Sequence, residues 1–135
     1  MIDVHQQTFT KHIMKIINWF QIPVSDLKRA VNFYSTVFKM SFHEMEHQGE
    51  KHAFFAMDAK DSQMTGGELV QSVNCKPGRD GVTIYLNPTD GLDAALMRLP
   101  ASGGKIIMPK TSIGENGWIA LVEDTEGNKI GIHSM

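Results

Sequence analysis

Residues 16–38, IINWFQIPVSDLKRAVNFYSTVF, decide the fold of this chain. Residues 16–24 are rich in β-branched and aromatic side chains, which favours a strand. Ser25-Asp26 is a typical helix N-cap, and apolar residues then recur at helical spacing. The stretch therefore predicts a strand that leads into an amphipathic helix. The apolar face of that helix consists of Leu27, Ala30, Val31, Tyr34, Val37 and Phe38.

The pattern of residues 18–70 returns 64 residues later, in residues 82–134. Two units that are too small to bury a core alone must pack on each other. We therefore expect an α+β fold of two βαβββ modules in a single domain, 15–134, with modules at about 15–73 and 81–134 and an N-terminal arm at 1–14. Three residue pairs mark the repeat: Asp26 and Asp90, Phe54 and Trp118, and Gly67 and Gly131.

Further strands are predicted from short apolar runs between turn residues. In the first module these are 41–47, 52–58 and 67–73. In the second module they are 82–87, 105–109, 117–123 and 129–134, with Pro88-Thr89-Asp90-Gly91 as turn and cap before a shorter helix. The hairpin turn at 124–128 contains Gly127, at a position where a positive φ is expected.

Composition excludes several classes of protein. No apolar run approaches the roughly 20 residues that span a bilayer, and a net charge of −2 with interspersed signs does not favour nucleic-acid binding. Cys75 is the single cysteine, which excludes an internal disulfide and fits a reducing compartment. We expect a cytoplasmic protein without membrane or nucleic-acid partners.

The segments 22–27, 30–40 and 124–134 resemble the vicinal-oxygen-chelate family, also called the glyoxalase/bleomycin-resistance/dioxygenase family. The resemblance covers about residues 15–134. It implies that each module curls its sheet into half of a cup, and that a small ligand, often with a divalent metal, binds inside. It also implies a homodimer.

The resemblance implies four metal-ligand positions, and none carries a strong donor here. The first, seven residues before Asp26, is Trp19, and the fourth, four residues after Gly127, is Gly131. The second falls on the strand after Gly49, on the face of Phe55 and Met57, and the third near Thr83. We therefore expect no metal and no other cofactor.

Gln21 and His133 lie one step along from the two firmly placed positions, on the same strand faces. They could form a displaced metal site or a pair that binds a ligand, and His133 could equally be a structural histidine. The predicted ligand site consists of Trp19, Gln21, Phe55, Met57, Thr83, Tyr85, Gly131 and His133, although the aromatic residues could instead fill a closed core.

Three functions follow as hypotheses. The first is a metal-free protein that binds a small organic ligand. The second is a metal-dependent lyase, isomerase or dioxygenase that uses Gln21 and His133. The third is an antibiotic-sequestering protein of the bleomycin-resistance type, which the few acids expected on the inward faces disfavour.

The segment 43–47 is a literal H-E-x-x-H motif, which on a helix would predict a zinc peptidase. The repeat places it opposite residues 105–109, which have the pattern of a strand. In a strand, His43 and His47 would lie about 13 Å apart, too far to share one ion. We therefore interpret the segment as an outer strand.

Overall fold

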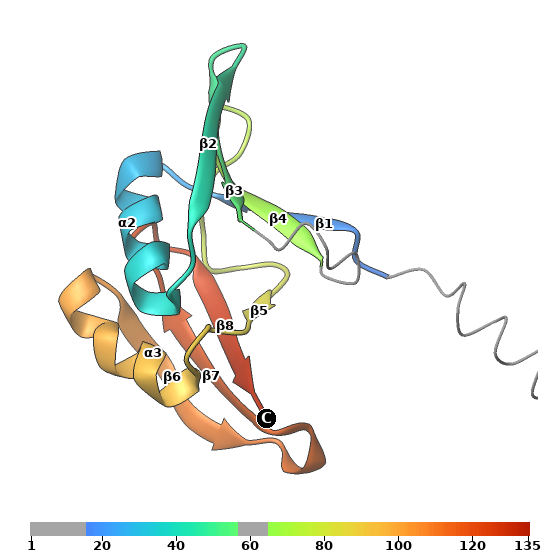
Figure 1. Ribbon diagram of the computed structural model, residues 1–135, viewed down its shortest axis with the longest axis vertical. Helices are drawn as coiled ribbons and strands as arrows, with labels where there is room; N and C mark the ends of the chain where they lie inside the picture. Colours follow the sequence, from blue (N-terminus) through green and yellow to red (C-terminus); the bar gives the residue numbers. More distant parts are fainter. Residues whose placement is uncertain (1–15, 57–64) are drawn as a thin grey trace, which may run out of the picture.

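The computed structural model describes residues 16–56 and 65–135, and these form two similar modules (Figure 1). The first contains a sheet of order β1-β4-β3-β2 and the second a sheet of order β5-β8-β7-β6. The predicted α+β fold of two βαβββ modules is confirmed. The first module consists of β1 (Trp19–Pro23), α2 (Leu27–Phe38), β2 (Phe42–His47), β3 (Glu50–Phe55) and β4 (Gly66–Gln71). The second consists of β5 (Tyr85–Leu86), α3 (Leu92–Arg98), β6 (Lys105–Ser112), β7 (Trp118–Glu123) and β8 (Lys129–Ser134), with 3-10 turns η1 (Pro100–Ser102) and η2 (Gly114–Asn116).

Helix α2 begins as its sequence predicts. The side chain of Asp26 caps the helix by accepting a hydrogen bond from the amide of Arg29 at 3.1 Å. The helix ends at Phe38, and the C-cap residue Lys39 adopts the left-handed conformation with φ 56°. Glycine is the usual residue in that conformation because it has no Cβ, so a lysine here requires an explanation.

Helix α3 begins differently from the prediction. Its N-cap is Gly91, with no side-chain cap, and Asp90 instead binds Arg98 through two hydrogen bonds of 2.8 and 2.7 Å. The same Arg98 donates to the carbonyl oxygen of Val37 at 2.7 Å. The aspartate that matches Asp26 in the repeat therefore fixes α3 against the end of α2.

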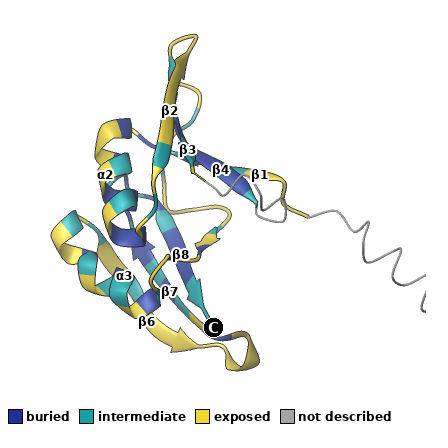
Figure 2. Ribbon diagram, viewed as in Figure 1, coloured by how far each residue is buried: buried dark blue, intermediate teal, exposed yellow. Residues whose placement is uncertain are grey.

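The core lies between the helices and one face of each sheet, and both modules contribute to it. Phe33, Tyr34 and Phe38 of α2 are fully buried, as are Ile132 of β8 and Leu99 after α3. Figure 2 shows the dark, buried ribbon in β4 and β8 and the exposed surface of the outer strands β2 and β6. None of the helices in the described ranges is long and apolar enough to cross a membrane.

The sequence suggested that the two modules correspond at one constant offset of 64 residues, and the structure shows that they do not. Gln21 pairs with Glu68 in the first sheet, and Tyr85 pairs with Gly131 in the second. Glu68 is therefore the structural counterpart of Gly131, and the predicted match of Gly67 with Gly131 is wrong. By the same registers, Leu121 and not Trp118 is the counterpart of Phe54, because Leu121 pairs with Gly131 and Phe54 pairs with Glu68.

Two strand predictions have clear outcomes. The H-E-x-x-H segment lies in the edge strand β2, which confirms that it is not helical. Strand β5 contains two residues, Tyr85–Leu86, and is shorter than the predicted 82–87. The first half of that segment lies outside the ladder with β8, since the described pairing begins at Tyr85.

Candidate functional site

The face of the first sheet that points away from α2 carries a cluster of polar and aromatic side chains, which we call the open face. Strand alternation separates it from the face of Ile22, Ala53 and Leu69, which are buried in the core. The register of the four strands then fixes its composition. The residues that matter for the site are Trp19, Gln21, Glu50, His52, Phe54 and Glu68.

Glu68 is the centre of this face. Its Oε2 accepts hydrogen bonds from Trp19 Nε1 at 3.0 Å and from Gln21 Nε2 at 3.1 Å. Its Oε1 lies 2.5 Å from His52 Nδ1. The residue is 5% exposed, and a buried carboxylate requires such partners. Three side chains from two neighbouring strands are therefore oriented by one carboxylate.

The charge of Glu68 follows from these contacts. Burial raises the pKa of the Glu68 carboxyl, but the hydrogen bonds from His52, Trp19 and Gln21 lower it by more, so the pKa lies below its usual range. Glu68 is therefore ionised at neutral pH. It places a fixed negative charge on the open face.

Aromatic rings surround the carboxylate. The ring centroids of Trp19 and Phe54 are 6.0 Å apart, and His52 stacks on Phe54 at 6.0 Å with an angle of 8° between the rings. Trp19 is 48% exposed, so its ring is available to a ligand. An aromatic surface with a few fixed polar groups is typical of small-molecule sites.

The polar chain continues from the carboxylate toward the end of the sheet. His52 Nε2 lies 3.5 Å from Glu50 Oε1, and Ser72 Oγ donates to Glu50 Oε2 at 2.5 Å. Two carboxylates, Glu50 and Glu68, thus flank one imidazole. The register places no lysine or arginine on the open face of the described strands β1 to β4. This face is therefore acidic at neutral pH.

The second sheet has its own open face, and the structure places other predicted residues there. Tyr85 lies across Gly131: a Cβ built at position 131 would lie 2.3 Å from Tyr85 Cδ2. His133 is on the same strand as Gly131, but its Nε2 lies 2.6 Å from the carbonyl oxygen of Asn116. Gln21 and His133 are thus on separate sheets, each bound to a different partner.

The remaining predicted residues lie elsewhere. Phe55, Thr83 and Tyr85 line a cleft of about 730 Å³ between the modules, which we call the intermodular cleft. Met57 lies outside the described residues. The structure therefore groups Trp19 with Gln21, Tyr85 with Gly131, and Phe55 with Thr83 and Tyr85.

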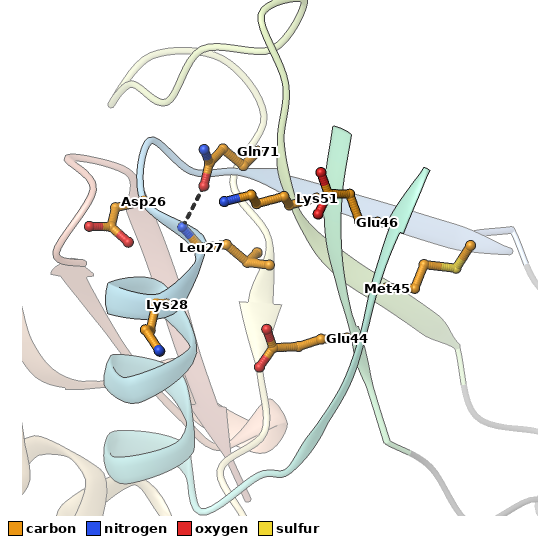
Figure 3. A pocket seen from close by; sticks show the side chains of 8 residues that line it. All are labelled: Asp26, Leu27, Lys28, Glu44, Met45, Glu46, Lys51 and Gln71. Carbon is orange, nitrogen blue, oxygen red and sulfur yellow. Dashed lines mark hydrogen bonds between the residues drawn. The ribbon is translucent and has the colours of Figure 1, made fainter. Parts of the chain in front are cut away.

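A second hollow, of about 380 Å³, lies between the start of α2 and the β2–β3 hairpin (Figure 3). Two of its polar groups have structural roles: Gln71 accepts a hydrogen bond from the amide of Leu27 at 2.8 Å, and Asp26 caps the helix. Figure 3 shows lysines and carboxylates along its wall, from Lys28 and Lys51 to Glu44 and Glu46. None of the predicted site residues lines it.

The chain belongs to the Glyoxalase/Bleomycin resistance protein/Dioxygenase superfamily, whose family model matches residues 16–132. A comparison with curated proteins gave no match. Three similar solved structures agree in fold, each at low sequence identity. The first is a superfamily domain from Frankia sp. EAN1pec (TM-score 0.68, 14% identity, 90% of this chain and 98% of that chain covered). The second is a hypothetical protein from S. aureus (TM-score 0.63, 17% identity, 92% of this chain and 99% of that chain covered). The third is a variant of a fosfomycin resistance protein from Listeria monocytogenes with Mn(II) and 1S,2S-dihydroxypropylphosphonic acid (0.66, 14%, 91% and 94%).

At the first and fourth of the expected metal positions, the residues present do not fit a metal ion. The indole of Trp19 presents an N–H donor, which binds Glu68, and Gly131 has no side chain. The Glu68 carboxylate could ligate a cation, but three side chains already occupy it. Within residues 16–56 and 65–135, no group of three or more His, Cys, Asp or Glu side chains could hold an ion.

Sequence reasoning missed Glu68 and His52. The sequence places the second metal position on the strand of Phe55 and Met57, whereas Glu68 lies on the next strand, β4. A usable signal was present, since Glu68 is the one charged residue in the otherwise apolar segment 66–70, GGELV. A charge in a buried, apolar strand is rare without specific partners, and here the partners are Trp19 and Gln21 of β1 and His52 of β3.

Proposed function

We propose that this protein binds a small organic ligand on the open face of its first sheet, and that it does so without a metal ion. The observation that carries the proposal is the buried Glu68 carboxylate, which orients Trp19, Gln21 and His52 on one exposed face. This face packs against no helix, so the three side chains that donate to Glu68 are not needed to fill the core. Superfamily membership supports a ligand-binding or enzymatic role.

The contacts define what each side chain would offer. The exposed indole of Trp19 and the ring of Phe54 provide surfaces for stacking. Gln21 turns its amide nitrogen toward Glu68, so its carbonyl oxygen, at the other end of the planar amide, is available to accept from a ligand. Glu68 acts mainly as the group that orients Trp19, Gln21 and His52.

A second candidate function is favoured by the charge of the same face. Glu50 and Glu68 lie beside two aromatic rings, and no lysine or arginine lies on the open face of the described strands. Such a surface suits an organic cation, through charge and through cation–π contact. This is the ligand chemistry of the bleomycin-resistance hypothesis, which the sequence alone had disfavoured.

The experiment compares a cationic probe with a matched neutral one. Benzyltrimethylammonium and neopentylbenzene have the same shape and differ in charge. Binding is followed by Trp19 fluorescence in a Trp118→Phe background. We expect the cation to bind more tightly than its neutral analogue, and Glu68→Gln to reduce that preference about fivefold. Glu44→Gln, on the opposite face of β2, is the matched control and should have no effect.

Equilibrium dialysis against zinc, nickel and manganese tests the metal-free part. Retention of one tightly bound ion per chain would contradict the metal-free proposal, and loss of that ion in His133→Ala would assign it to the displaced site. If neither probe changes Trp19 fluorescence but the chain binds metal, the displaced-site hypothesis replaces it. Homodimerisation and a cytoplasmic location stay predictions, to be checked by light scattering and by fractionation of the source cells.

A further inference from the structure

The intermodular cleft lies away from the open face and is lined by different residues. Phe20 and Phe55 point to the helix side of the first sheet, whereas Trp19, Gln21 and Phe54 point to the other side. The opposite wall is the segment around β5, including Ile84 and Tyr85. Its volume of about 730 Å³ is within the range of small-molecule pockets.

The floor of the cleft is aromatic and fixed in place. The Phe20 and Phe55 ring centroids are 5.4 Å apart, and Phe55 also packs on Phe42 at 4.6 Å. Gly67 makes room for Phe20, since a Cβ there would lie 2.3 Å from the ring. Phe55 further contacts the buried Tyr34 at 6.3 Å, edge to face. These ring contacts hold Phe20 and Phe55 in place at the floor of the cleft.

One end of the cleft is polar and includes Lys39, whose positive charge also acts on the neighbouring Asp90 carboxylate. Lys39 is the one charged residue among its described lining residues, which include no carboxylate. Lys39 holds the left-handed conformation at the end of α2, which is unfavourable for a residue with a Cβ. Its backbone is held there by Thr89, whose hydroxyl donates to the Lys39 carbonyl at 2.8 Å. The fold therefore keeps a lysine where glycine would be more stable.

We propose that the intermodular cleft binds an amphiphilic anion, with an apolar body on Phe20 and Phe55 and a carboxylate or similar group at Lys39. This site is separate from the open face and of opposite charge preference, so it would admit a second class of ligand. The chemistry follows from the single cation, the aromatic floor and the absence of acids in the described lining. Strained backbone at a functional position supports the assignment of Lys39.

Decanoate and decanol are the probes, because they share the apolar chain and differ in charge. Isothermal titration on the full chain should give tighter binding of decanoate, with about fourfold weaker binding for each methylene group removed. Lys39→Gly should weaken decanoate about fivefold and leave decanol unchanged. The same variant should raise the melting temperature, because it relieves the left-handed lysine. A purely structural lysine would not give this opposite pair of effects.

Lys28→Gln is the control, since Lys28 lies at the other end of the same helix and outside the cleft. It should change neither affinity. Equal affinity for both probes, or no dependence on chain length, would overturn the proposal. Light scattering with and without decanoate covers the remaining case: if the chain self-associates and decanoate neither binds nor changes that association, a second copy of the chain occupies the cleft and the proposal is wrong.

Discussion

Glu68 shows how much of the open face depends on one side chain. Replacing it with glutamine keeps the shape but leaves one acceptor oxygen for three donors, Trp19, Gln21 and His52. A buried polar group without a partner costs about 1–3 kcal/mol. We expect Glu68→Gln to lower the free energy of unfolding by about that amount at pH 7, measured by urea denaturation.

The pKa of Glu68 gives this effect a direction in pH. Because the folded-state pKa is lowered by hydrogen bonds from His52, Trp19 and Gln21 against the effect of burial, the stabilisation is present above the unfolded pKa of about 4.3. It is lost as pH falls through the folded value. The cost of Glu68→Gln should therefore shrink in acid. A cost that is the same at pH 7 and in strong acid would contradict this account.

At the scale of elements, the contact between β5 and β8 depends on a residue without a side chain. Gly131→Ala would place a Cβ 2.3 Å from Tyr85 Cδ2. We expect a loss of about 1–3 kcal/mol in the free energy of unfolding, as for other overpacked sites. Tyr85→Ala should remove most of that additional loss in the double variant. Gly78→Ala is the control, because a Cβ there meets nothing within 4 Å, and it should change stability by less than about 0.5 kcal/mol.

The elements also show what the sequence could predict and why the rest could not be. Helix α2 was predicted with its cap and its apolar face, because hydrophobic periodicity and capping are local signals. Glu68 was missed because its role depends on the parallel register between β1 and β4, whose paired residues lie 47 positions apart in the sequence. Register between distant strands depends on the lengths of intervening connections, and these differ between the modules. A constant repeat offset therefore gave the right strands and the wrong partner for Gly131.

At the scale of the molecule, Glu126 joins the two modules. This residue of the second module accepts hydrogen bonds from the amides of Ser25 and Asp26, and Arg29 binds both of its oxygens. Burial raises the pKa of Glu126, but these donors and Thr125 lower it by more, so that the pKa is about 2. The stabilisation is therefore complete above about pH 4.5 and is lost as pH falls toward 2.

We expect Glu126→Gln to lower the free energy of unfolding by about 2 kcal/mol at pH 7 and by much less near pH 2.5. Urea denaturation at both pH values measures the difference. Glu115→Gln is a matched control, because Glu115 is exposed in η2. Equal losses at the two pH values would show that Glu126 acts through its shape and not through its charge.

The shared core predicts that the modules unfold together. Tyr34 of the first module binds Asp124 of the second at 2.6 Å, inside a core to which both contribute. The chain has two tryptophans, Trp19 in one module and Trp118 in the other. Trp19→Phe and Trp118→Phe each leave one reporter, and both should give the same urea midpoint once each variant's stability by circular dichroism is taken into account. If the two variants have equal stability by circular dichroism but different urea midpoints by tryptophan fluorescence, the modules do not unfold as a single cooperative unit.

The ring of Tyr85 over Gly131 constrains the order in which this chain could acquire a metal site. A carboxylate or imidazole at position 131 needs space that the ring now fills. Such a substitution is therefore harmful while Tyr85 remains, and it becomes acceptable after a smaller residue has replaced the tyrosine. Selection for metal binding, in nature or in the laboratory, would have to change position 85 first, through an intermediate that gains nothing from the change. Libraries that vary both positions together avoid that barrier.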